Sequence, residues 1–267
     1  MKLLFSEYKS DYANYIFPYA IWAVPEGKES PARFFARGFL PSSRDFERFY
    51  LCRQVRVNLQ NFTRTSENRR ILRKCQDIQF NLVPISDFEF TEEWREFCKH
   101  YADIKFGKDV MTRDRLDSLF RSKIVTHVLV FHDSKTEQAV GLVTLYLEKK
   151  TLAYYYYAFY DLNYYERNLG MFMMTSAVDY FAAENVNSMY LGTCYSRNAL
   201  YKTQFRGAEF FNGFQWSQNL KELKYMIERD GSAVTQHLIE TEEYCQKFYH
   251  GKIHAIGKVS EFTLFLE

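Results

Sequence analysis

The sequence predicts an α/β (α+β) protein with a mixed, largely antiparallel sheet and a smaller N-terminal α/β lobe. Three strand-like runs follow one another over residues 124–131, 140–147 and 152–160, joined by short polar turns, as in an antiparallel meander. Helical and strand-like patterns then alternate between residues 167 and 216. With 267 residues, 47% of them hydrophobic and 25% charged, the chain can bury a large core, which excludes disordered and collagen-like proteins.

The length is enough for one large domain or two small ones, because single cores stop growing near ~250 residues. Of these we expect two domains, an N-terminal domain over 1–85 and a C-terminal domain over 86–267. The sequence does not indicate an oligomeric state.

In the N-terminal half, the first 40 residues are expected to form extended segments and turns, because prolines interrupt an aromatic stretch. Residues 50–59 alternate apolar and polar side chains and predict a half-buried strand. A helix is expected to begin after Thr65 or Ser66, either of which can cap it, and to reach Lys74.

Thr91 is the expected cap of the next helix, which Gly107 ends, and Thr112 starts another that reaches Arg121. After the meander, we expect a helix over 167–184, a buried strand over 188–192, a helix over 199–205 and a strand over 210–216. The last ~50 residues are helical in periodicity, interrupted at Gly231 and ending near Gly251.

The charge pattern combines near neutrality with one basic segment. The net charge is +2, so no global field points to nucleic acid as a partner. Residues 44–74, however, hold nine Lys or Arg and three Asp or Glu. Within this segment, Arg64, Arg69, Arg70, Arg73 and Lys74 could contact phosphates; a solvated helix face is the alternative.

Several classes of site are disfavoured. The N-terminus becomes charged too early for a signal peptide, and the longest apolar run, 139–147, is too short for a bilayer, so we expect a cytoplasmic protein without membrane contact. The cysteines are scattered and are expected to be free thiols: Cys52, Cys75, Cys98, Cys194 and Cys245. The histidines show no metal or triad spacing, and no histidine is close to Cys194 in sequence. We predict no metal and no nucleophilic catalysis.

The order of strands and helices in the second half is similar to that of the GNAT acyltransferase fold. The central helix of that fold binds phosphate groups at its N-terminus, after a turn of the form Arg/Gln-x-x-Gly-x-Gly/Ala. Here the turn is Arg167-Asn168-Leu169-Gly170-Met171-Phe172. Phe172 would crowd a pyrophosphate, which favours a ligand other than coenzyme A; a plain helix start with one glycine is the other interpretation.

Four blocks between Tyr156 and Glu209 carry a more specific resemblance. Phe159-Tyr160-Asp161-Leu162 is similar to Phe-Phe-Asp-Pro, and Asn168-Leu169-Gly170-Met171-Phe172 is similar to Ser-Leu-Gly-x-Phe. Tyr190-Leu191-Gly192 and the segment from Tyr201 to Glu209 are similar to Tyr-Leu-Gly and Tyr-Lys-x-x-Phe-x-Pro-x-Glu. These are motifs of the aminoacyl-tRNA–protein transferases, the arginyl- and leucyl-transferases, whose C-terminal domain is GNAT-like.

The N-terminal half resembles the same family through Arg37-Gly38-Phe39, the strand around Arg56 and the basic segment after Phe62. The departures concern cysteine and proline. The family's N-terminal cysteine cluster is missing, with only Cys52 near its place, and no proline follows Asp161 or Arg206. These departures bear on any metal or redox role and on which amino acid is transferred.

The resemblance implies transfer of an amino acid from charged tRNA to a protein N-terminal amine, an N-degron type of modification. Aminoacyl-tRNA is then the co-substrate, a protein or peptide N-terminus is the acceptor, and no cofactor is needed. It implies catalytic roles for Asp161, Tyr201 and Lys202, and tRNA contacts for the basic segment. The expected substrate-binding residues are Tyr156, Phe159, Arg167, Asn168, Gly170, Tyr195 and Arg206.

Alternatives stay open for single residues and for the whole chain. Asp161 could cap the next turn, Lys202 could be an exposed lysine, and the tyrosines at 154–157 could fill the core. An N-acetyltransferase that uses acetyl-CoA is the second enzyme class. A diverged, inactive member that binds tRNA or protein is the third possibility.

Overall fold

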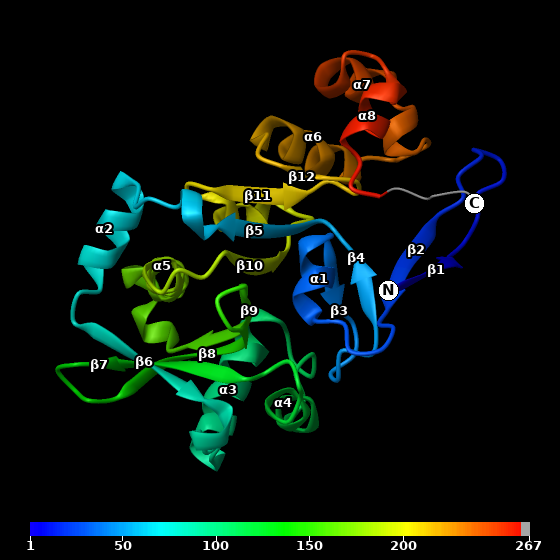
Figure 1. The fold of residues 1–267 in the computed structure, drawn as a ribbon. Coiled ribbons are helices and arrows are strands. Elements are labelled where there is room, and N and C mark those ends of the chain that lie inside the picture. The colour runs from blue at the N-terminus through cyan, green and yellow to red at the C-terminus, as the bar shows by residue number, and fades with distance from the viewer. Residues whose placement is uncertain (263–267) are drawn as a thin grey trace. The chain divides into compact units, whose positions relative to one another are not determined.

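The computed structural model describes residues 1–262, and these form two compact units (Figure 1). The first unit contains residues 1–55, 193–204 and the chain from Ala208 onward, and the second contains 56–192 and 205–207. These units group residues by contact, whereas the domains 1–85 and 86–267 were inferred from the sequence, and that division stays a prediction.

The second unit is built on a mixed, mostly antiparallel sheet, which confirms the predicted fold class. Its strands lie in the order β10-β9-β8-β7-β6. They are β6 (Ile78–Pro84), β7 (His127–Asp133), β8 (Ala139–Glu148), β9 (Leu152–Tyr160) and β10 (Ser188–Thr193). Strands β6 to β9 pair antiparallel, and β10 pairs parallel to β9 with Ser188 opposite Leu152. The meander therefore has the expected order, and β9 matches its predicted range.

A helix joins the two parallel strands, because a parallel pair cannot be closed by a tight turn. This helix, α5 (Leu169–Ala183), follows the 3-10 turn η3 (Leu162–Arg167) and matches the predicted helix over 167–184. It covers one face of the sheet: Phe172 contacts Phe131, and a Cβ on Gly141 would lie 2.7 Å from Met173 Sδ. The close approach of α5 to β8 thus requires glycine at position 141.

The opposite face of the sheet is covered by α3 (Glu92–Lys105) and α4 (Arg113–Phe120). Both begin at the predicted threonine caps, whose side chains accept hydrogen bonds from backbone N–H groups. Their apolar sides form one core with sheet residues of the same face. That core includes Tyr101, Leu116, Phe120, Val128, Val130, Leu142 and Phe159.

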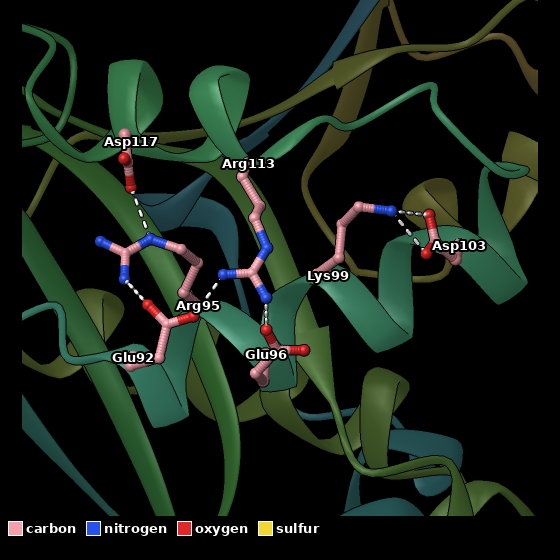
Figure 2. A network of polar contacts seen from close by, with 7 residues as sticks. All are labelled: Glu92, Arg95, Glu96, Lys99, Asp103, Arg113 and Asp117. Carbon is pink, nitrogen blue, oxygen red and sulfur yellow. Dashed lines mark hydrogen bonds and ion pairs between the residues drawn. The ribbon is translucent and has the colours of Figure 1, made fainter.

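A chain of ion pairs joins α3 to α4 on their polar side (Figure 2). Arg113 pairs with Glu92 and Glu96, and Arg95 pairs with Glu92 and, at 2.8 Å, with Asp117. The hydrogen bonds from Arg113 and Arg95 lower the pKa of Glu92. A carboxyl group with a lowered pKa in the folded state stabilises the fold at pH values above its unfolded-state pKa. That stabilisation is lost as the pH falls through the folded-state pKa. The exposed position of Glu92 keeps the effect small.

The remaining elements of the second unit lie around the basic segment. Helix α2 (Ser66–Lys74) begins at Thr65, one of the two predicted caps, and η1 (Leu59–Asn61) and η2 (Ile85–Asp87) are single 3-10 turns. The segment after α2 forms β6, an edge strand that the sequence analysis did not assign. Its Phe80 lies opposite Phe131 of β7 and contacts Tyr180 of α5.

The first unit contains a second antiparallel sheet, ordered β1-β2-β4-β3. The strands are β1 (Lys2–Glu7), β2 (Tyr19–Val24), β3 (Phe39–Pro41) and β4 (Phe49–Leu51), with the short helix α1 (Pro31–Ala36). The first 40 residues thus form extended segments and turns, as expected, with one short helix. Phe34 of α1 stacks on Phe49 with ring centroids 4.2 Å apart, and both are fully buried.

Three predicted elements were wrong in detail: the strand over 50–59, the strand over 210–216 and the helix over 199–205. The strand expected over 50–59 is two strands, because the chain leaves β4 at Cys52 and Arg53 before β5 (Gln54–Asn58) begins. The strand over 210–216 is a hairpin of β11 (Ala208–Phe211) and β12 (Trp216–Ser217). Its turn forms because the Asn212 side chain accepts hydrogen bonds from the N–H groups of Phe214 and Gln215. The helix over 199–205 is the 3-10 segment η4 (Arg197–Thr203).

The C-terminal segment is helical, as predicted, but does not end near Gly251. It contains α6 (Leu220–Asp230), η5 (Leu238–Glu240), α7 (Glu242–Tyr249) and α8 (Ile253–Val259), and the first break follows Asp230 at Gly231. Gly251 has a φ of +71°, which turns the chain out of α7 so that α8 can begin.

A buried carboxylate holds the C-terminal helices to the β11–β12 hairpin. Glu222 of α6 is 2% exposed, and its Oε1 accepts hydrogen bonds from Asn212, Tyr244 and Tyr249 at 2.9, 2.6 and 2.9 Å. Its Oε2 accepts from Ser217 at 2.7 Å. Burial and the adjacent carboxylate raise the pKa of Tyr249 to about 12, so its hydroxyl stays a donor.

We expect Glu222→Gln to lower the free energy of unfolding by about 1.5–3 kcal/mol, because an amide NH₂ would face hydroxyl and amide donors in a buried site. The control is Glu242→Gln, an exposed carboxylate in the first turn of α7, which should cost less than ~1 kcal/mol. Urea denaturation of both variants measures the difference. Equal losses would mean that the Glu222 network contributes no more than a surface charge.

Candidate functional site

The predicted site residues lie in both compact units. Asp161, Tyr156, Phe159, Arg167, Asn168, Gly170 and Arg206 belong to the second unit, as do Arg64, Arg69, Arg70, Arg73 and Lys74, and Tyr195, Tyr201 and Lys202 belong to the first. Each group is described within its own unit.

Asp161 lies at the end of β9 and caps the turn that follows. Its Oδ1 accepts a hydrogen bond from the Asn163 N–H at 2.9 Å, which makes it the N-cap of η3. Its Oδ2 accepts no hydrogen bond from the described residues. Asp161 thus caps the next turn, which was the alternative to a catalytic role, and its Oδ2 remains available to a ligand.

The turn before α5 contains a left-handed residue and a closely packed glycine. Asn168 has a left-handed φ of 59°, and no side chain caps the helix there. A Cβ on Gly170 would lie 2.7 Å from Cε1 of the Tyr160 ring. The glycine is therefore required for the packing of α5 against β9, which gives it a role independent of any phosphate.

Arg167 points to a carboxylate of its own unit. Its guanidinium pairs with Asp77 and also donates to the Lys74 carbonyl at 3.3 Å. The hydrogen bond from Arg167 lowers the pKa of Asp77, which Lys135 also approaches at 3.3 Å. The charge of Arg167 is thus largely matched by Asp77, which argues against an open phosphate site at the start of α5.

The five predicted phosphate contacts of the basic segment are exposed, and two of them are already paired with carboxylates. Arg64 binds Asp179 through two hydrogen bonds of 2.5 and 2.6 Å, and Arg70 binds Glu67 at 2.6 and 2.8 Å. Arg69 and Lys74 donate to the backbone carbonyls of Arg64 and Glu166, which leaves their charges unmatched. Arg73 is exposed and makes no polar contact with the described residues. Arg69, Arg73 and Lys74 are therefore the members best able to meet phosphates.

Two of the aromatic candidates differ in exposure. Phe159 is fully buried in the core beneath α3, where its ring lies 5.9 Å from that of Tyr101. Tyr156 is half-buried at a β-bulge, where the pairing of β8 with β9 shifts register and Thr144 accepts a hydrogen bond from the Tyr157 N–H. Bulges re-aim side chains and are frequent beside functional sites.

Arg206 is exposed and donates to Thr63 at 3.3 Å.

In the first unit, one peptide group organises the predicted residues. The carbonyl of Thr193 accepts a hydrogen bond from Lys202 Nζ at 2.8 Å. The N–H of the next residue, Cys194, donates to the Arg53 carbonyl at 2.8 Å. Lys202 and Arg53 are thus held at opposite sides of the same peptide, and Tyr201, beside Lys202, is 41% exposed.

Arg53 was not a predicted site residue, but it is the most unusual side chain of this group. It is 10% exposed, pairs with Asp230 at 2.9 Å, and lies over the Tyr195 ring at 4.9 Å. Its Nε and Nη1 are buried and have no hydrogen-bond partner. Gln54, the next residue, is fully buried with neither amide atom hydrogen-bonded. The sequence showed Arg53 only as part of the basic excess, and nothing in it indicated burial.

Tyr195 combines an exposed ring with a fixed hydroxyl. The side chain is 51% exposed, and its hydroxyl accepts a hydrogen bond from the Arg53 N–H at 2.8 Å. Because a phenol oxygen can accept and donate at once, the proton of Tyr195 remains available to a ligand oxygen. Desolvation raises the pKa of Tyr195, so the hydroxyl keeps this proton.

Burial has opposite effects on the pKa values of Lys202 and Cys194. It lowers the pKa of Lys202, because the charged ammonium loses water. It raises the pKa of the Cys194 thiol, an effect that Lys202 and Arg53 partly offset. A thiol with a raised pKa is a poor nucleophile at neutral pH, which argues against covalent catalysis by Cys194.

No group of three or more potential metal ligands occurs among residues 1–262, and the five cysteines are free and buried. Over the same described range, none of the helices combines the length and apolar character needed to cross a bilayer.

Comparison with known proteins gives one distant relative. No protein-family model matches the chain. An aspartate/glutamate leucyltransferase from Saccharophagus degradans is 26% identical over 172 residues, which are 62% of this chain and 70% of that protein. This similarity supports an acyl or aminoacyl transferase as the general kind of protein.

Solved structures show weaker likeness. The C-terminal domain of a protein from Agrobacterium fabrum, described as a lysylphosphatidylglycerol synthetase, is 15% identical with a TM-score of 0.44, over 54% of this chain and 46% of that one. FemX is 7% identical with a TM-score of 0.40, over 53% of each chain. The chain thus spans about half the length of each of these structures.

We expect Gly170→Ala to lower the free energy of unfolding by about 1–3 kcal/mol, because the new methyl group overlaps the Tyr160 ring. In a Tyr160→Ala background the same change should cost less, because the ring is gone. A double-mutant cycle of thermal or urea unfolding measures this coupling. Additive effects would show that Gly170 is not required by Tyr160, and would return it to the phosphate-binding interpretation.

Proposed function

We propose that this chain is an aminoacyl-tRNA–protein transferase, which moves an amino acid from charged tRNA to the α-amine of a protein N-terminus. The observation that carries the proposal is the similarity to an aspartate/glutamate leucyltransferase over 172 residues. That relative favours leucine over arginine as the donated amino acid, and Asp or Glu as the acceptor residue. The product would carry a new N-terminal residue of the kind that marks proteins for degradation. We place this activity in the cytoplasm, with no cofactor besides the charged tRNA.

The reaction needs alignment more than covalent help. The neutral α-amine attacks the ester carbonyl carbon, a C–N bond forms, and the C–O bond to the ribose breaks. The amine loses a proton and the ribose oxygen gains one, so no oxidant or cofactor is consumed. Because the aminoacyl ester is already activated, a site that orients the amine and stabilises the oxyanion is sufficient.

The first unit offers two groups that could stabilise the oxyanion. The Tyr195 hydroxyl, fixed by the Arg53 N–H, has a proton to donate to the developing oxyanion. Lys202 adds positive charge beside the Thr193 carbonyl, where it would favour the same oxyanion. In the second unit, Oδ2 of Asp161 could accept a hydrogen bond from an ammonium group or receive a proton.

Acetyl-CoA is the weaker donor candidate, for reasons in the second unit. A pyrophosphate site at the start of α5 would need an open turn and an unmatched cation. Instead, Tyr160 fills the space above Gly170, Arg167 pairs with Asp77, and Phe172 is only 4% exposed. The tRNA phosphates have better partners in the exposed Arg69, Arg73 and Lys74.

A transfer assay tests the proposal. Purified protein is incubated with tRNA charged with radiolabelled leucine or arginine and with peptides that differ only in the first residue; parallel reactions contain labelled acetyl-CoA. We expect label to pass from leucyl-tRNA to peptide, and Lys202→Met to reduce the rate by about 10–100-fold. Lys224→Met, which changes an exposed lysine of α6, is the control.

The other outcomes are distinct. Label from arginyl-tRNA alone would keep the reaction and change the donor. Label from acetyl-CoA alone would make the chain an N-acetyltransferase, and no transfer from any donor would contradict an enzymatic role and favour a binding protein.

The salt dependence of tRNA binding tests the basic segment. Arg69→Ala combined with Arg73→Ala should reduce the slope of log K against log salt by about 1–2, because fewer counterions are released. Arg121→Ala, an exposed arginine at the end of α4, should leave the slope unchanged. Filter binding or fluorescence anisotropy at several salt concentrations measures it. An unchanged slope in the double variant would place these arginines on a solvated face.

A further inference from the structure

The environment of Arg53 contains more positive than negative charge. Arg53 and Arg229 share one carboxylate, that of Asp230, which contacts Arg53 at 2.9 Å and Arg229 at 3.6 Å. Two cations that share one anion leave a net positive charge, which favours a further anion.

Arg53 also has unused donors. A buried N–H without an acceptor is costly, and few such groups occur in folded proteins. Nε and Nη1 of Arg53 are both in this state, although the side chain is only 10% exposed. The adjacent Gln54 has an amide group that is likewise buried and unsatisfied. Unsatisfied polar groups on consecutive residues are the pattern of a site that is completed by a ligand.

We propose that Arg53 determines the specificity of the acceptor, by binding the side-chain carboxylate of an N-terminal Asp or Glu through its unpartnered N–H groups. This inference rests on the proposed function and adds the residue that recognises the first side chain of the acceptor. Asp230 holds one edge of the guanidinium and leaves the others for the incoming carboxylate.

Tyr195 connects this binding to the reaction. Its ring lies over the guanidinium face, and its hydroxyl is fixed by the Arg53 N–H. The ring is 51% exposed, and in this proposal it moves off the guanidinium when the carboxylate binds. A carboxylate bound there is largely out of water, where a charged hydrogen bond is strong. The neutral Asn and Gln, which have the same shape, would lose this interaction.

The chemistry favours a carboxylate of a peptide over a phosphate of tRNA. The Arg53 side chain is only 10% exposed, and its guanidinium already has one carboxylate partner. The exposed cations of the second unit, Arg69, Arg73 and Lys74, are better placed for a long polyanion. The tRNA alternative is one arm of the test.

Peptide binding without tRNA tests the inference separately from transfer. Isothermal titration of the full chain with matched peptides that begin with Asp or Asn needs no catalysis. We expect the wild-type protein to prefer Asp by about 10–100-fold, and Arg53→Gln to abolish most of that preference. Arg53→Lys keeps the charge but not the fork of donors, so it should retain an intermediate preference. Arg197→Gln, at an exposed arginine of the same unit that pairs with Glu228, is the control.

The outcomes separate the two proposals. A preference for Asp that depends on Arg53, without any transfer activity, would support the site and contradict the function. Transfer with equal use of Asp and Asn peptides would support the function and overturn the site. Loss of binding to a tRNA acceptor-stem hairpin in Arg53→Gln, with the Asp preference intact, would assign the anion to RNA and overturn the proposal. The wild-type comparison of Asp with Asn decides the question even if an Arg53 variant does not fold.

Discussion

The parallel pairing of β10 with β9 is the constraint on which the second unit depends. Antiparallel strands can follow one another through short turns, but a parallel neighbour requires a crossover. Helix α5 makes that crossover, and its packing fixes the details around it: glycine at 141 beneath Met173, glycine at 170 against Tyr160, and Asn168 in a left-handed turn. With α5 on one face, the other face needs its own cover, which α3 and α4 provide. The ion pairs of Figure 2 then lie on the polar side of those helices, where they add little to stability.

Periodicity predicted the regular part of this fold well, because the strands and helices there bury one consistent face. The meander and α5 are examples, and β9 was predicted to the residue. A side-chain hydrogen-bond pattern explains one case that failed. Asn212 turns the chain within an apolar run that otherwise resembles one strand. The bulge at Tyr156, where Thr144 accepts from the Tyr157 N–H, was likewise not visible in the sequence pattern. Such contacts depend on single atoms, which a hydrophobic pattern does not record. The strand β6 was missed although Ile78, Phe80 and Leu82 alternate with polar residues.

For the candidate site, the residues named from the sequence stay predictions, and the structure shows only what they contact. Lys202 donates to the Thr193 carbonyl and Tyr195 accepts from the Arg53 N–H, whereas Arg167 and Gly170 have structural partners in Asp77 and Tyr160. Arg53 could not be identified from sequence, because its importance comes from burial and from Asp230, a residue far away in the chain. An arginine between two strands is ordinarily solvated, and only tertiary structure shows that this one is not.

The pairing of Arg53 with Asp230 has a physical rationale that a bare cation would lack. An isolated buried guanidinium would be expensive to desolvate, and a fully paired one would have no donors left for a ligand. Arg53, with the Asp230 carboxylate at one edge of its guanidinium, lies between these two cases. The carboxylate lowers the free-energy cost of burying the charge in the absence of ligand, and it leaves Nε and Nη1 of Arg53 without acceptors. Arginine suits this arrangement better than lysine, because its donors point in several fixed directions and its flat face can stack on Tyr195. The Tyr195 ring also carries the hydroxyl that could contact the oxyanion. The residue proposed to bind the acceptor carboxylate, Arg53, is therefore in direct contact with the residue proposed to stabilise the oxyanion, Tyr195.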